Sequence, residues 1–158
     1  MEARFVHVNV IARDWRRLCF FYQEVFGCIP VPPERHLGGE WLSRATGVPE
    51  AALQGMHLRL PGGGDGGPTL EVFQYSSLLE QLPPAANRPG FGHVAFEVAD
   101  VPAAVKAVLA HGGTLIGEVV RRSINGVGAI TFAYARDPED NIIELQQWDT
   151  EPVSEAGL

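Results

Sequence analysis

The chain has 158 residues, of which 46% are hydrophobic, and its net charge is −7 because 19 acidic residues outnumber 12 basic ones. This size suits one well-cored domain or two fused half-domains, and the acidic balance argues against nucleic acid or an anionic membrane as the main partner. The chain begins directly with a strand pattern and shows no signal peptide and no membrane span, which predicts a cytoplasmic protein.

Two helices and four strands are expected in the first half. Alternation of apolar and polar residues is typical of half-buried strands, whereas apolar residues at helical spacing between Asp14 and Gly27 indicate a capped helix. Three prolines restrict the second strand to a short edge strand. The expected elements are a strand over 4–11, a helix between Asp14 and Gly27, an edge strand over 28–33, a short helix over 40–46, and strands over 55–60 and 69–75.

The second half is expected to have the same order of elements without the short helix. Asp100 is the expected N-cap of its helix, which Gly112 and Gly113 end. Strands are expected over 91–98, 114–121, 128–135 and 141–148. The predicted organisation is a first βαβββ module over 1–75, a linker over 76–90, a second βαβββ module over 91–148 and a flexible tail over 149–158, all forming one domain.

The two halves repeat one another in sequence. Residues 5–14 align without gaps with residues 91–100, with Phe, His, Val and Asp in register. Residues 70–75 align with residues 143–148, so that Glu pairs with Glu and Gln with Gln. Because an internal repeat determines the architecture, the sequence predicts an α+β fold of two βαβββ units.

The repeat singles out four polar residues on predicted strands, which are His7, Glu71, His93 and Glu144. Each has apolar neighbours on both sides, so strand alternation places the four on the face opposite the core, the concave face of a curved sheet. A lone strand histidine is more often structural than a ligand, but a histidine and a glutamate at matched places in both repeats favour a metal site. Two imidazoles and two carboxylates suit one divalent ion among Zn, Ni, Co, Mn and Fe(II).

Other polar and aromatic residues receive weaker predictions. Alternation places Asn9 and Gln146 on the same concave face, where they are either substrate contacts or solvated rim residues. Phe73 shares the face of Glu71 and is a candidate for lining a substrate pocket. Three further histidines have no counterpart in the other repeat and are given no role in the site; they are His36, His57 and His111.

These paired strand histidines, together with the run Asp137–Leu145 (DPEDNIIEL), resemble the vicinal oxygen chelate superfamily over about residues 4–148. That group includes glyoxalase I, methylmalonyl-CoA epimerase, extradiol dioxygenases, and bleomycin- and fosfomycin-resistance proteins. The resemblance implies paired βαβββ modules that form a cupped mixed sheet around a divalent metal, which chelates vicinal oxygens of a small-molecule substrate. The His-Glu-His-Glu order looks like that of glyoxalase I.

The resemblance implies a lyase or isomerase of glyoxalase or epimerase type. It would abstract a proton next to a carbonyl and stabilise an enediolate on the metal. Glu71 or Glu144 would be the base; Glu71 is slightly preferred, because the hairpin of Glu144 matches the family better as a fixed ligand. The alternatives are an Fe(II) ring-cleaving or other oxygenase and a non-catalytic binding or resistance protein. A homodimer is expected, and the sequence leaves open whether glutathione or CoA is part of the substrate.

Overall fold

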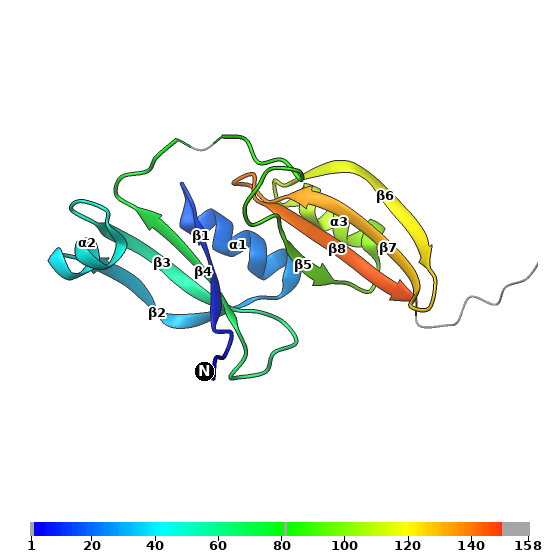
Figure 1. Ribbon diagram of the computed structural model, residues 1–158, viewed down its shortest axis with the longest axis horizontal. Coiled ribbons are helices and arrows are strands. Elements are labelled where there is room, and N and C mark those ends of the chain that lie inside the picture. Colours follow the sequence, from blue (N-terminus) through cyan, green and yellow to red (C-terminus); the bar gives the residue numbers. More distant parts are fainter. Residues whose placement is uncertain (1, 81, 150–158) are drawn as a thin grey trace, which may run out of the picture. The chain divides into compact units, whose positions relative to one another are not determined.

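The computed structural model describes residues 2–80 and 82–149. The chain divides into two compact units, residues 1–82 and 83–158. Each unit contains one four-stranded mixed sheet accompanied by helices (Figure 1). This confirms the expected α+β class and the two βαβββ repeats, of which the first carries one additional short helix.

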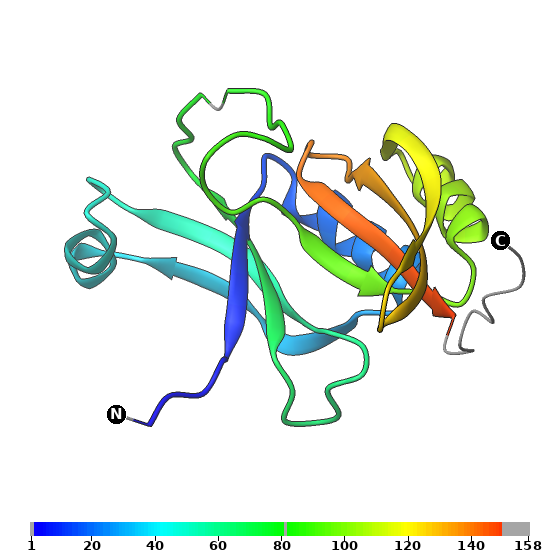
Figure 2. The same cartoon turned by 45° about the vertical axis from the view of Figure 1, so that its right-hand side comes forward.

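In the first unit the strands lie in the order β1-β4-β3-β2. Strand β1 is parallel to β4, and the other pairs are antiparallel. Helix α2 follows β2 and lies at the far end of the β2–β3 pair (Figure 2). The elements are β1 (His7–Ile11), α1 (Trp15–Phe26), β2 (Ile29–Gly38), α2 (Glu40–Thr46), β3 (Ala52–Arg59) and β4 (Thr69–Tyr75).

Helix α1 has the predicted caps. The Asp14 carboxylate accepts a hydrogen bond from the Arg17 backbone N–H at 3.0 Å, and Gly27 ends the helix with φ of 66°. The helix packs against β3 and β4 on the face that buries their apolar residues. Burial raises the pKa of the Cys19 thiol to about 12 and that of Cys28 to about 11, so both thiols stay protonated at neutral pH.

The second strand differs from the prediction of a short edge strand over 28–33. Strand β2 has ten residues and pairs with β3 along most of its length, with a register shift between Val31 and Arg35. The Pro32–Pro33 pair lies within this irregularity. An edge strand needs ladder donors on one side only, so a bulge can hold both prolines without ending the strand.

In the second unit the strands lie in the order β5-β8-β7-β6, with β5 parallel to β8. Helix α3 covers one face of this sheet (Figure 2) and buries Val101, Val105 and Val108. Leu109, an apolar residue that follows Val105 and Val108 at helical spacing, is half exposed and not part of this buried face. The elements are β5 (Val94–Glu97), α3 (Val101–Ala110), β6 (Thr114–Ile124), β7 (Gly128–Arg136) and β8 (Ile142–Asp149).

The paired glutamines of the repeat have a structural role. The side-chain oxygen of Gln74 faces the backbone N–H of Trp15 at 3.5 Å, and that of Gln147 faces the N–H of Val101 at 3.4 Å. Both acceptors meet the first turn of a helix, where backbone donors have no partner within the helix. The last strand of each unit is thereby linked to the start of the helix of that unit.

Within residues 2–80 and 82–149, none of the helices has both the length and the hydropathy needed to cross a bilayer. The residues of the predicted tail that follow Asp149 lie outside the described residues.

Candidate functional site

Two histidines flank the carboxylate of Glu71 in the first unit. The Nε2 atom of His7 lies 3.4 Å from Oε2 of Glu71, and the Nε2 atom of His57 lies 3.1 Å from Oε1. Strand register explains this proximity, because Glu71 on β4 pairs with Asn9 on β1 and with His57 on β3. Residues paired across a sheet point to the same face. His7 lies two residues before Asn9 on β1, so its side chain points to that face as well.

Asn9 completes what we call the first polar cluster, consisting of His7, Asn9, His57 and Glu71. Its side-chain amide donates to the backbone oxygen and to Oε2 of Glu71, both at 3.4 Å. The Glu71 side chain is only 12% exposed. A carboxylate this covered requires polar partners, and three side chains of the cluster supply them.

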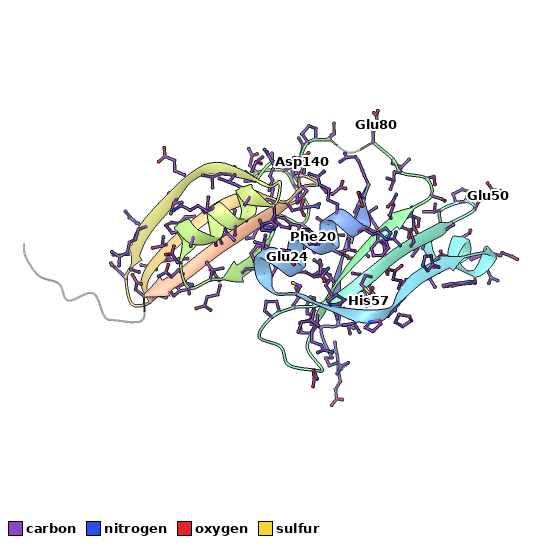
Figure 3. The ribbon with its side chains drawn as sticks, turned by 180° about the vertical axis from the view of Figure 1, so that it is seen from behind. Phe20, Glu24, Glu50, His57, Glu80 and Asp140 are labelled. Carbon is purple, nitrogen blue, oxygen red and sulfur yellow. The ribbon has the colours of Figure 1, made fainter. Side chains whose placement is uncertain are left out.

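His57 is the member that sequence reasoning missed. It has no histidine counterpart in the other repeat, and only the β3–β4 register shows that it faces Glu71. Its position on β3 is marked in Figure 3. Burial lowers the pKa of His57, Arg35 and His7 lower it further, and only Glu71 acts in the opposite direction. A lowered pKa keeps the imidazole neutral near pH 7, the form that can donate through one nitrogen and accept through the other.

Phe73 joins the first polar cluster to a small apolar cluster beside α2. Its ring centroid lies 5.7 Å from that of His57, and its side chain also packs against the buried group of Leu42, Ala51 and Leu53. Gly55 on β3 lies directly opposite Phe73. A Cβ atom at Gly55 would lie 2.6 Å from the Phe73 ring and would also collide with the Val72 backbone oxygen. The missing side chain at Gly55 therefore lets the Phe73 ring lie close over β3.

The second unit brings together what we call the second polar cluster, consisting of His93, Tyr134 and Glu144. His93 lies one residue before β5, and its Nε2 atom is 2.8 Å from Oε2 of Glu144. Tyr134 pairs with Glu144 across β7 and β8, and its ring centroid lies 5.1 Å from that of His93. Burial, and then the Glu144 charge, raise the pKa of Tyr134. The phenol therefore stays protonated at neutral pH.

The two clusters correspond at the histidine and the glutamate and differ at two positions. Asn9, which pairs with Glu71, is matched by Ala95, which pairs with Glu144. His57 and Tyr134 hold equivalent register positions opposite Glu71 and Glu144. Gln146 lies two residues beyond Glu144 on the same face, paired with Phe132. The repeats therefore share a histidine–glutamate pair and differ in both residues that pair with the glutamate across the neighbouring strands.

The donor atoms in both clusters are imidazole nitrogens and carboxylate oxygens, which suit a divalent transition metal. Each cluster brings one of the predicted histidines against one of the predicted glutamates. In the described part of the chain, no group of three or more His, Cys, Asp or Glu side chains is arranged so that it could hold a metal ion. The four-ligand set stays a prediction from the sequence. The nitrogen and oxygen donors of the two His–Glu pairs are chemically consistent with it.

Comparisons with known proteins identify the family. The model of the Glyoxalase/Bleomycin resistance protein/Dioxygenase superfamily matches residues 4–145. No curated protein matches the chain. Three solved structures with the same fold are similar to it. The comparisons cover 94–95% of this chain and 95–99% of the other chains.

A glyoxalase family protein from Bacillus cereus is 21% identical, with a TM-score of 0.78. The fosfomycin resistance protein FosX from Listeria monocytogenes, in complex with Mn(II) and sulfate, is 15% identical, with a TM-score of 0.57. A virulence protein from Salmonella typhimurium is 22% identical, with a TM-score of 0.52. At these identities the likeness concerns the fold, whereas the family model spans most of the sequence. The chain belongs to the Glyoxalase/Bleomycin resistance protein/Dioxygenase superfamily, the vicinal oxygen chelate group.

Proposed function

We propose that the protein is a divalent-metal-dependent lyase or isomerase that abstracts a proton next to a carbonyl, as glyoxalase- and epimerase-type enzymes do. The observation that carries this proposal is the repeated pairing of a histidine nitrogen with a glutamate carboxylate, at 3.4 Å for His7 and Glu71 and at 2.8 Å for His93 and Glu144. In the proposal these four residues are the metal ligands.

Two further observations support a metal. Membership in the superfamily is consistent with a divalent ion, and the FosX structure contains Mn(II) on the same fold. When bound, such an ion would polarise the two neighbouring oxygens of the substrate. The proposed substrate is a small molecule with vicinal oxygens, contacted by Asn9, Phe73 and Gln146. The homodimer predicted from the sequence is kept in this proposal.

The unequal surroundings of the two glutamates bear on which of them moves the proton. Glu71 is approached by two imidazoles and by the Asn9 amide, so each of its oxygens already has a partner. Glu144 has one imidazole, that of His93, against one oxygen. A general base needs an oxygen free to receive the proton. We therefore propose Glu144 as the base and Glu71 as the fixed ligand, the reverse of the preference drawn from the sequence.

Hydrogen exchange tests the proposed reaction. Metal-loaded protein is incubated anaerobically in D₂O with glutathione hemithioacetals and with methylmalonyl-CoA, and the C–H signal next to the carbonyl is followed by proton NMR. We expect this signal to disappear for at least one compound, because abstraction and return of the proton exchange it with solvent. Chelation of the metal is expected to abolish the exchange.

Two outcomes would contradict the proposal. Turnover that requires O₂ would favour the oxygenase alternative. Tight binding of a compound without exchange or conversion would favour a non-catalytic binding protein.

A further inference from the structure

We infer that His57 is a positioning residue, which fixes the Glu71 carboxylate in the orientation that ligation requires. The inference rests on the proposed function, since it concerns how one proposed ligand is held. It assigns a role to a histidine that has no counterpart in the other repeat.

The contacts of Glu71 divide its carboxylate between two sides. His57 approaches Oε1 at 3.1 Å from β3, whereas His7 and Asn9 approach Oε2, both at 3.4 Å, from β1. A carboxylate held at only one oxygen can rotate about its terminal torsion, which is broad for Glu. The second contact, from His57, removes this rotation and directs Oε2 toward His7. Polar groups that contact a metal-ligating carboxylate orient it in this way.

The His57 ring is itself held in place. It lies edge-on between two other rings, with centroid distances of 6.4 Å to His7 and 5.7 Å to Phe73. The side chain is 22% exposed. The close approach of Phe73 depends on Gly55, as a Cβ atom there would overlap the Phe73 ring. The imidazole is therefore held by its ring neighbours, as a positioning residue must be.

The second repeat provides an internal comparison. Tyr134 occupies the position equivalent to His57, opposite Glu144, but among the described residues it makes no hydrogen bond to that carboxylate. Removal of the Tyr134 hydroxyl is therefore expected to leave Glu144 where it is. A variant at Tyr134 and a variant at His57 can therefore be compared. The comparison separates the loss of a directed contact from the general effect of changing a residue beside a glutamate.

Metal titration of the full-length protein tests the inference. Metal-free wild type and four variants are titrated with Mn(II), with free Mn(II) followed by electron paramagnetic resonance. We expect His57→Ala to weaken Mn(II) binding by about 10- to 100-fold. His57→Gln should restore most of the affinity, because its amide N–H can donate from nearly the position of the imidazole Nε2. Tyr134→Phe and the exposed-residue control His36→Ala should change affinity by less than about threefold.

Thermal unfolding of the metal-free variants accompanies the titration, since a merely structural role would lower the unfolding temperature without rescue of affinity by Gln. Wild-type affinity in His57→Ala would overturn the inference while leaving the proposed function intact. Equal loss in the Ala and Gln variants, both folded, would also overturn it, because it would make the imidazole itself a ligand.

A crystal structure of metal-free His57→Ala provides a readout that does not depend on metal. We expect Glu71 Oε2 to move out of contact with His7. An unchanged His7–Glu71 contact would overturn the inference. If the wild type bound no Mn(II), the proposed function would fail on its own, and this structure would still decide the role of His57.

Discussion

Replacing Glu144 with alanine is expected to weaken binding of the divalent metal by about 100-fold or more, or roughly 2.7 kcal/mol. The variant removes one proposed ligand outright and leaves His93 without the carboxylate that lies 2.8 Å from its Nε2 atom. Glu71→Ala should cause a comparable loss, because the repeat places Glu71 in the equivalent position. Isothermal titration with Mn(II) or Co(II) measures both effects.

Glu24→Ala is the matched control for the two glutamate variants. Glu24 is an exposed carboxylate on α1 (Figure 3), so its removal lowers the net negative charge by the same amount without touching either polar cluster. Its affinity for metal should equal that of the wild type. If Glu71→Ala and Glu144→Ala both retained wild-type affinity, the proposed ligand set would be wrong.

The second large effect is expected at Asp137, whose replacement by alanine should lower the free energy of unfolding by roughly 3 kcal/mol. Asp137 is only 2% exposed. Its Oδ1 atom accepts from the backbone N–H groups of Glu139 and Asn141, at 2.8 and 3.0 Å, and its Oδ2 atom accepts from the Asn141 side chain at 2.9 Å. Alanine would leave these covered donors without their acceptor at the turn that leads into β8.

Urea unfolding followed by circular dichroism measures the loss at Asp137. Asp137→Asn retains one carbonyl acceptor and should lose less stability than Asp137→Ala. Asp65→Ala is the surface control, because Asp65 pairs with Arg59 while remaining almost fully exposed, and such pairs contribute little. Equal urea midpoints for Asp137→Ala and the wild type would show that this turn does not hold β8 in place.

Helices and buried strands were predictable because their signals are local. Asp14 and Asp100 are the N-caps that the sequence indicates, and each accepts a hydrogen bond from a backbone N–H of the first turn. The apolar neighbours of the two glutamates, such as Leu70 and Leu145, are fully buried as alternation predicts. In these segments the side-chain pattern and the tertiary environment agree.

The prediction was wrong where position in the sheet outweighed local pattern. Val6 is one of the two apolar neighbours of His7, which strand alternation places on the core side. It is 53% exposed, because β1 begins at His7 and is an edge strand. The length of β2 was underestimated, since prolines that would end a central strand are tolerated at an edge.

The candidate site was partly predictable because strand alternation, like helix capping, is a local signal. Two copies of a histidine and a glutamate on alternating strands predicted that the four side chains lie on the face opposite the core and together hold one metal ion. The structure brings His7 to Glu71 and His93 to Glu144, and the four-ligand site stays a prediction. The role of His57 depends on the antiparallel register of β3 against β4, which pairs it with Glu71. Neither the repeat nor the residue type carries that register, so the contact became visible only in three dimensions.

Metal binding by the wild-type protein tests the central claim most directly. The protein is stripped with a chelator and titrated separately with Mn(II), Fe(II), Co(II), Ni(II) and Zn(II), and native material is assayed by elemental analysis. We predict saturable binding of at least one of these ions, and its loss when His7 and His93 are both replaced by alanine. Absence of any bound divalent ion in the native protein, together with no binding in any titration, would contradict the claim.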